Sequence, residues 1–224
     1  MARTIGRTSP TPIPEVVIMR LPVYMRALSN LLSKGAEVVS SQGLGDHLGV
    51  TPAQIRKDFS YFGRFGKQGR GYNVRYLLSE LRQILGLQRE WHTALIGVGR
   101  LGRAIIGYPG FAPGGFKMAV AFDVNPEQVA TSIGDIPVLS MAELEPTLVR
   151  LNIQIAIVAV PAAEAQAVIG RLVNCNIKAI LNYAPVQPQV PPDVHVRNID
   201  PVLALQSMTY YLKQMTNGPS SAAP

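Results

Sequence analysis

The segment His92-Thr-Ala-Leu-Ile-Gly97-Val98-Gly99-Arg100-Leu101-Gly102 decides the fold, because in it a short apolar run leads straight into a glycine-rich turn. A helical pattern follows from Arg103 to Tyr108. A GxGxxG motif alone is weak evidence, but one that follows a strand and opens a helix has the context of a dinucleotide-binding turn. The segment therefore predicts the first strand, turn and helix of a Rossmann-like fold.

Each glycine of this turn has its own task in holding a dinucleotide. Gly97 allows the tight turn, Gly99 lets the backbone approach the pyrophosphate, and Gly102 permits close packing of helix on strand. The helix start offers free N–H groups to the phosphates. A glycine turn without a ligand is the alternative interpretation, and the next strand argues against it.

That second strand, Met118 to Phe122, ends in Asp123, at the distance from the glycines that the dinucleotide fingerprint expects. The Asp123 carboxylate can accept hydrogen bonds from the adenosine ribose hydroxyls, and its charge would repel a 2′-phosphate. We therefore expect the cofactors NADH and NAD+ and not their 2′-phosphorylated forms.

The rest of this half alternates strands with helices. Strand patterns lie at 155–160, 179–182 and 194–199, and helical patterns lie at 141–150 and 162–173. Such alternation predicts a parallel sheet with both faces covered. The strand-end residues Val160, Pro161 and Asn182 should then lie where the nicotinamide binds.

The charge of the chain is unevenly distributed. Residues 1–90 contain 13 Lys or Arg against 6 Asp or Glu, whereas residues 91–224 contain 8 of each. The formal net charge of +7 therefore lies in the first part, as expected for a nucleic-acid-binding module joined to a neutral domain. A solvated basic face without a partner is the alternative.

Three helices follow one another in the basic part. Leu21 to Leu32 has helical spacing, with Pro22 placed in its first turn. Ser40 or Ser41 can cap a second helix that ends at Gly49, and Thr51 caps a third, with Gln54 completing a capping box. The pair predicts a helix-turn-helix whose second helix enters the major groove.

The predicted DNA surface consists of polar and basic side chains at the second and third helices and in the glycine-rich segment 62–72. Four glycines in nine residues preclude a helix there and favour a bent hairpin, a wing with its basic residues at the tip. A last helix, about 74–85, should close the domain. An ordinary helical hairpin with solvent-facing charge is the competing interpretation. The predicted DNA-binding residues are Ser41, Thr51, Gln54, Arg56, Lys57, Ser60, Tyr61, Lys67 and Arg70.

The final segment, Pro201 to Met215, is amphipathic with a wide apolar face and no further sheet to cover. We expect it to pack on another subunit, since helix-turn-helix proteins usually bind two half-sites as dimers. A helix folded back on its own domain is the alternative.

Composition excludes several classes of protein. One cysteine, Cys175, forms no internal disulfide, and three widely separated histidines suggest no metal site. The opening 15 residues lack an apolar run, and no later apolar run is long enough to cross a bilayer, so we expect a cytoplasmic protein with no membrane partner.

The assembled pattern resembles the Rex family of bacterial redox-sensing transcriptional repressors over nearly the whole chain. The segments that carry the resemblance are 20–26 (RLPVYMR), 54–58 (QIRKD), 62–72, the Gly97–Gly102 turn, 198–200 (NID) and 210–212 (YYL). Gly43 and Gly45 in the second helix and Arg64 in the wing depart from the family pattern. The expected organisation is a disordered arm (1–15), a winged helix-turn-helix domain (16–87), a Rossmann-like α/β domain (88–200), a swapped dimerisation helix (201–217) and a disordered tail (218–224).

The resemblance implies a homodimer with exchanged terminal helices that binds an inverted-repeat operator when NADH is scarce and releases it when NADH rises. It also implies that Arg20, Tyr108 and Asp200 form a network that rearranges with the nicotinamide, and it adds Tyr108 to the cofactor site.

Three other functions share parts of the pattern. An NAD-dependent dehydrogenase uses the same glycine turn, but too few residues follow the nucleotide fold to build a substrate domain, and no acid–base residue stands out. Some Rossmann-like domains bind coenzyme A instead. The nucleotide fold could also serve only as a dimerisation scaffold for a DNA-binding protein.

Overall fold

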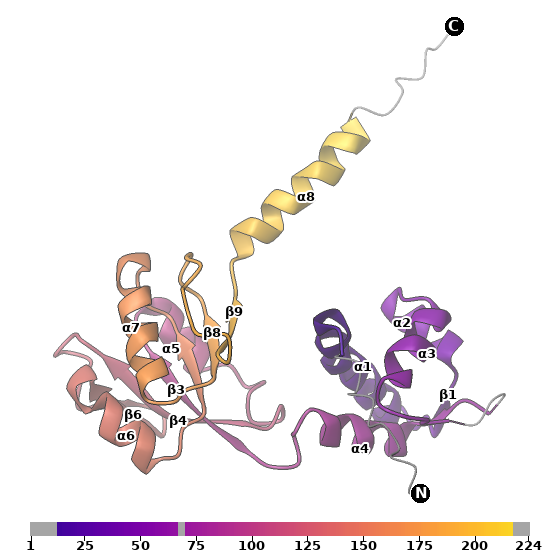
Figure 1. Ribbon diagram of the computed structural model, residues 1–224, viewed down its shortest axis with the longest axis horizontal. Helices are drawn as coiled ribbons and strands as arrows, with labels where there is room; N and C mark the ends of the chain where they lie inside the picture. The colour runs from indigo at the N-terminus through magenta and orange to yellow at the C-terminus, as the bar shows by residue number, and fades with distance from the viewer. Residues whose placement is uncertain (1–12, 67–69, 217–224) are drawn as a thin grey trace, which may run out of the picture. The chain divides into compact units, whose positions relative to one another are not determined.

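The computed structural model describes residues 13–66 and 70–216 of the 224-residue chain. The chain divides into two compact units, residues 1–89 and 90–224, which are described separately (Figure 1). Most of the predicted arm, the predicted tail and the wing residue Lys67 lie outside the described residues. Within the described parts, no helix has both the length and the apolar character needed to span a membrane.

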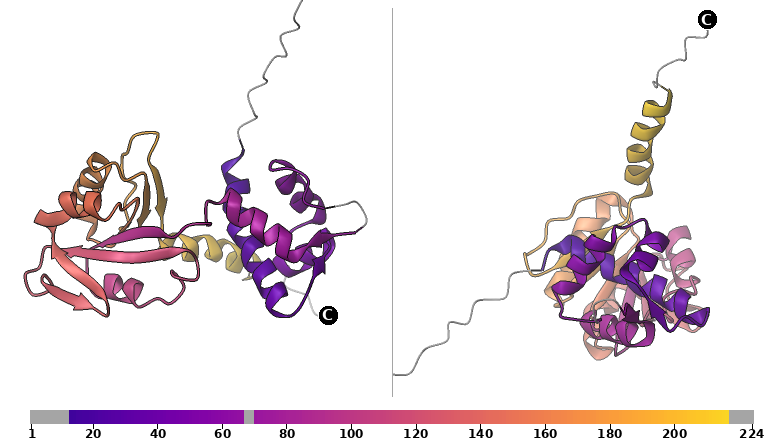
Figure 2. Two further views of the ribbon diagram at one scale, coloured as in Figure 1. Left: turned by 90° about the horizontal axis from the view of Figure 1, so that it is seen from below. Right: turned by 90° about the vertical axis from the view of Figure 1, so that its right-hand side faces the viewer.

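The first unit is a helical domain with one small antiparallel strand pair (Figure 2). Its core joins all four helices through buried apolar side chains such as Leu28, Leu44, Ile55 and Leu77. The elements are α1 (Glu15–Ser33), β1 (Val38–Val39), α2 (Ser41–Leu48), α3 (Pro52–Ser60), β2 (Tyr72–Asn73) and α4 (Val74–Ile84).

Helix α1 begins earlier than the sequence predicts. It starts at Glu15, and Pro22 lies inside it rather than in its first turn. Burial of Val17 and Leu21 on the face that also carries Tyr24 explains the extra turns, because tertiary packing stabilises a helix beyond its local signals. Glu15, the last residue of the predicted arm, is thus the first residue of α1.

The caps of the helix-turn-helix are those predicted. Ser40 Oγ, rather than that of Ser41, accepts from Gly43 N at 2.9 Å, and Thr51 Oγ1 accepts from Gln54 N at 3.2 Å. Gly45 is required by packing, because a Cβ there would collide with the carbonyl oxygen of Val50 in the turn. The departure from the family pattern at Gly45 thus has a local physical reason.

The second unit is a seven-stranded sheet in the order β5-β6-β4-β3-β7-β8-β9. All neighbouring strands are parallel except the edge pair β5–β6. Helices α6 and α7 cover one face and α5 covers the other (Figures 1 and 2). The elements are β3 (Trp91–Ile96), α5 (Arg100–Ile106), β4 (Phe116–Asp123), β5 (Thr131–Ile133), β6 (Ile136–Ser140), the 3-10 helix η1 (Met141–Glu143), α6 (Leu144–Arg150), β7 (Ile155–Val158), α7 (Ala162–Asn174), β8 (Ala179–Asn182), β9 (His195–Asn198) and α8 (Pro201–Thr216).

Alternating residues of each strand pack into two separate hydrophobic cores, one on each face of the sheet. On β3, Ala94 and Ile96 pack with the α6 and α7 side, whereas Leu95 packs with Ile105 of α5. This period of two is what a sheet covered on both faces requires. The predicted α/β fold, a helix-turn-helix domain followed by a Rossmann-like parallel sheet, is confirmed.

In the second unit, some boundaries and two strands differ from the prediction. The hairpin β5–β6 was not predicted, since its strands are only three and five residues long, Gly134 lies in the turn between them and Pro137 interrupts the second. Helix α5 begins at Arg100 inside the glycine turn, not at Arg103, and strand β7 ends at Val158, before the predicted Val160.

Candidate DNA and dinucleotide sites

The glycine turn lies where β3 passes into α5 at the carboxyl end of the central strands. Gly97 has φ +94°, and its N–H donates to Phe122 O at 2.8 Å, so the turn is tied to the end of β4. A Cβ on Gly97 would lie 2.5 Å from Ala159 O, and one on Gly102 would collide with Gly97 O. Gly99, by contrast, has no atom within 4 Å of the Cβ position, which leaves room for a ligand against the backbone.

Asp123 stands beside this turn at the end of β4. Its Oδ2 accepts from Val98 N at 2.6 Å, and its Oδ1 accepts from Asn125 N at 2.8 Å. These bonds hold the partly buried carboxylate next to the glycines, where the fingerprint places the ribose. The Asp123 carboxylate, which can accept hydrogen bonds from ribose hydroxyls, and the open space at Gly99 together fit an NAD-type dinucleotide.

A second hydrogen bond joins α5 to the loop after β4, next to the glycine turn. Arg103, on α5, donates from Nη2 to Gln128 Oε1 in the loop after β4. The loop is further shaped by Asn125, whose side-chain oxygen accepts from Glu127 N at 3.0 Å. Sequence reasoning missed Gln128, and nothing in its spacing from Asp123 would have signalled it.

The other predicted cofactor residues have mixed surroundings. Arg100, Leu101 and Tyr108 are exposed, and Tyr108 makes an edge-on ring contact with Phe111 at 5.6 Å. Val160 and Pro161 follow β7, with Pro161 as the cap residue of α7.

Asn182, at the end of β8, is held by a set of hydrogen bonds within the second unit. It is fully buried, its Nδ2 donates to Ala184 O at 3.0 Å and Asn198 Oδ1 at 2.9 Å, and its Oδ1 accepts from Ala184 N at 3.0 Å. The side chain therefore shapes the loop after β8, and a direct contact with the cofactor remains only a prediction.

Helix α3 presents a basic outer face. Arg56, Lys57 and Ser60 are exposed, and Arg56 Nη1 donates to Ser41 Oγ at 3.0 Å, joining α2 to α3. Thr51 is exposed but occupied as the cap, and Tyr61 is half-buried at the end of the helix. These exposed guanidinium and ammonium groups suit contact with phosphates or guanine.

Beneath that face lies a buried carboxylate that sequence reasoning did not single out. Asp58 is 0% exposed and accepts four hydrogen bonds, from Arg20 Nε at 2.6 Å, Arg20 Nη2 at 2.7 Å, Tyr24 OH at 2.5 Å and Gln54 Nε2 at 2.7 Å. Burial by itself raises the pKa of Asp58, but these donors outweigh it and hold the pKa below its usual value. The sequence held one signal for this role. Asp58 is the one acidic residue among six basic residues in segment 56–75, and it lies one helical turn after Gln54.

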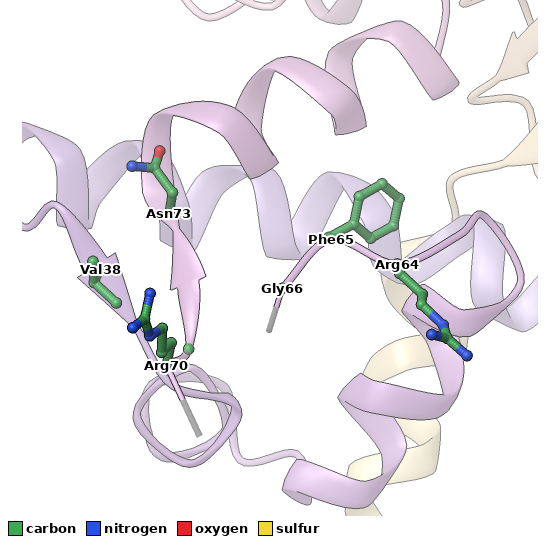
Figure 3. A pocket seen from close by; sticks show the side chains of 7 residues that line it. Val38, Arg64, Phe65, Gly66, Arg70 and Asn73 are labelled. Carbon is green, nitrogen blue, oxygen red and sulfur yellow. The ribbon is translucent and has the colours of Figure 1, made fainter. Parts of the chain in front are cut away.

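The wing contributes an open hollow beside β1 and β2 (Figure 3). Exposed Arg64 and Arg70 flank it. A Cβ on Gly66 would lie 2.8 Å from Gly71 O, so glycine lets the two sides of the wing approach each other. Strand β2 pairs with β1, and no strand pairing within the wing is described.

The three predicted switch residues have partners within their own units. Arg20 forms the fork to Asp58 in the first unit. In the second unit, Asp200 Oδ1 accepts from Val202 N at 2.9 Å at the start of α8, and Tyr108 contacts Phe111. A network joining the three remains a prediction.

Both units resemble known protein families. A family model described as the CoA binding domain matches residues 88–186, and one described as the N-terminus of a putative DNA-binding protein matches residues 12–60. Relatives called redox-sensing transcriptional repressor Rex include one from Roseiflexus sp., 53% identical over 94% of this chain and 96% of its own. Another, from Brevibacillus brevis, is 44% identical over 89% of this chain and 97% of its own.

Solved structures agree. A crystal structure of RSP with beta-NAD+ and operator DNA has a TM-score of 0.87 at 39% identity, covering 92% of this chain and 95% of that one. RSP with beta-NADH has a TM-score of 0.83 at 37% identity, covering 92% and 97%. With these relatives over nearly its whole length, the chain belongs to the Rex family of redox-sensing transcriptional repressors.

Proposed function

We propose that this protein is a DNA-binding repressor, not an enzyme, that senses the ratio of NADH to NAD+. The observation that carries the proposal is one polypeptide with two sites: a capped recognition helix with exposed Arg56 and Lys57, and a glycine turn held against Asp123. RSP, a Rex-family repressor of closely similar fold, has been crystallised with NAD+ and operator DNA and with NADH.

In the proposed cycle the protein holds an inverted-repeat operator when NADH is scarce and leaves it when NADH is bound. Thermodynamic linkage sets the condition: the arrangement unable to bind DNA must have the higher affinity for NADH, and DNA must weaken NADH binding by the same factor. NAD+ carries a positive nicotinamide ring that NADH lacks, and in the proposed cycle this difference lets NAD+ occupy the same site without favouring the arrangement that releases DNA.

Helix α8 supports assembly as a homodimer. Every residue from Pro201 to Met215 is exposed within the single chain, including Leu203, Leu205 and Met208 at about 60%. A contiguous apolar face of this kind is costly in water and marks a protein interface. A partner copy that receives the helix would give the two recognition helices their two-fold relation.

The individual contacts are proposed from position and chemistry. On the DNA side we propose Arg56, Lys57, Ser60 and the wing arginine Arg70. On the cofactor side we propose the Gly97–Gly102 turn and Asp123. A repressor acting on chromosomal DNA in this way would work in the cytoplasm.

The test is a titration of a protein–operator complex at fixed salt, followed by fluorescence anisotropy. The duplex would be one selected from random sequence by the purified protein. Release by NADH at a concentration far below that needed with NAD+ is the expected result, and DNA binding indifferent to both would refute redox sensing. Coenzyme A belongs in the same titration, since the matched domain model is described as CoA binding.

A further inference from the structure

We propose that Asp58 is a positioning residue that fixes the side-chain amide of Gln54 for reading one base pair of the operator. The inference rests on the proposed function, because it assigns a specificity role within the same DNA-binding helix. Gln54 lies in the first turn of α3, the part of a recognition helix that contacts base edges. Asp58 lies one turn later on the buried side and is bonded to it.

The carboxylate decides which way the amide faces. An ionised carboxylate has only acceptors, so Gln54 must turn its nitrogen, not its oxygen, toward Asp58. The bond from Nε2 to Asp58 Oδ1, at 2.7 Å, uses one of the two hydrogens on that nitrogen. The other hydrogen and Oε1 stay available, and one donor plus one acceptor is the set that pairs with adenine N7 and N6 in the major groove.

The carboxylate is itself held by three further hydrogen bonds. The Arg20 fork holds both its oxygens, and the buried Tyr24 hydroxyl donates to Oδ2 at 2.5 Å. Tyr24 in turn packs edge-on against Phe59 of α3 at 5.3 Å. Contacts therefore connect Arg20 and Tyr24 of α1, through the fully buried Asp58 carboxylate, to the partly buried Gln54 side chain of α3.

This arrangement separates two kinds of contact on one helix. Lys57 is exposed and long, so it can contact the duplex in several geometries, and Arg56 is exposed and makes one surface hydrogen bond, to Ser41 Oγ. Gln54 is partly buried and held in one orientation. A preorganised amide loses little side-chain entropy on binding, which favours discrimination between bases.

The experiment measures base discrimination by the full-length protein. The probes are a duplex selected from random sequence by the wild-type protein and the set of its single base-pair variants. We expect Gln54→Ala to lower discrimination at one base pair per half-site by about 5- to 150-fold, the range of one good side-chain pair. Asp58→Asn, whose amide can face either way, should lower discrimination at that same base pair and little elsewhere.

The double variant Gln54→Ala/Asp58→Asn separates positioning from a general structural role. If Asp58 acts through Gln54, the double variant discriminates no worse than Gln54→Ala alone. Equal weakening at every base pair, with the same loss in the Gln54→Ala background, would overturn the proposal. Retention of full discrimination by a folded Asp58→Asn protein would do so as well.

A matched control exists on α2, where Gln42 Nε2 donates to Asp46 Oδ1 at 2.7 Å with the same spacing of four residues. Asp46→Asn should keep full discrimination at the Gln54 base pair. Should Asp58→Asn not fold, Arg20→Lys and Tyr24→Phe each loosen the carboxylate while leaving it ionised. Both should lower discrimination at that base pair only when Gln54 is present, and an effect that persists in Gln54→Ala would overturn the proposal.

These results also separate the proposal from the function on which it rests. A wild-type protein that selects no sequence would refute the repressor function. A wild-type protein that selects an operator, with no base pair sensitive to Gln54→Ala, would refute only the positioning role.

Discussion

The carboxylate of Asp123 accepts a hydrogen bond from the backbone N–H of Val98 at 2.6 Å, which ties the end of β4 to the middle of the glycine turn. One residue thus both shapes the turn and supplies the negative charge next to the proposed ribose site. Substitution of Asp123 should therefore change cofactor choice and turn stability together.

Asp123→Ala should reduce the preference for NADH over NADPH by about 10-fold or more, the scale of one hydrogen bond to a charged group. Isothermal titration with each cofactor measures the ratio. The control is Asp135→Ala, which removes an exposed charge from the β5–β6 hairpin of the same unit. An unchanged ratio in Asp123→Ala would contradict the assigned role.

Gly99 and Gly102 should respond differently to the same substitution. Gly102→Ala would place a Cβ against Gly97 O, so we expect the unfolding free energy to fall by about 1–3 kcal/mol. We expect the same variant to lose cofactor binding, because the turn would be displaced. Gly99→Ala meets nothing within 4 Å and should change stability by less than about 1 kcal/mol. It should nevertheless lower NADH affinity, because its methyl group occupies the space left for the pyrophosphate.

Urea unfolding and NADH fluorescence titration of the two variants provide the measurements. Normal NADH binding by a stable Gly99→Ala protein would show that the pyrophosphate does not approach this residue.

Arg56→Ala should abolish operator binding while leaving NADH affinity intact, because Arg56 is exposed on α3 and belongs to the other unit. A base or phosphate contact of this kind is worth about 1–3 kcal/mol, and a two-fold dimer loses it twice. Arg82→Ala, an exposed arginine in the last turn of α4, removes the same charge from the same unit as a control. Anisotropy with the selected duplex measures both, and equal loss of DNA and NADH binding would refute the two-site interpretation.

The sequence was a good guide wherever local chemistry decides structure. The caps at Ser40 and Thr51, the glycine turn and the strand that ends in Asp123 were all predictable, because each depends on residues close together in the chain. Arg20 and Asp58 are 38 residues apart, and only the packing of α1 on α3 joins them. The start of α1 was missed for the same reason, since its first turns depend on burial of Val17.

Tyr24 predicts a particular loss of stability at alkaline pH. Burial and the hydrogen bond to ionised Asp58 raise the pKa of Tyr24 well above its ordinary value. A raised pKa in the folded state gives stability that is present below the unfolded pKa, about 10, and is lost as the pH rises above it. The unfolding free energy of wild type should therefore fall toward that of Tyr24→Phe between pH 8 and 11, by about 1.4 kcal/mol per pH unit above 10.

Urea unfolding of both proteins across that range measures the trend, with Tyr76→Phe, on the exposed side of α4, as the control for general alkaline effects. A constant difference between wild type and Tyr24→Phe would show that burial and the Asp58 bond do not raise the pKa of Tyr24 in the folded protein.

Helix α8 allows the assembly to be tested apart from either site. Leu205 and Met208 are 62% and 58% exposed in the single chain, and burial of that exposed surface in a partner copy would stabilise each by about 1–2 kcal/mol. Leu205→Glu/Met208→Glu should raise the dimer dissociation constant by at least about 1,000-fold, since four side chains are altered per dimer. Gln206→Glu adds charge to the same helix as a control, and sedimentation velocity measures the mass. Operator binding should weaken with dimerisation, because two half-sites require two recognition helices. An intact dimer carrying both glutamates would mean that α8 does not form the interface.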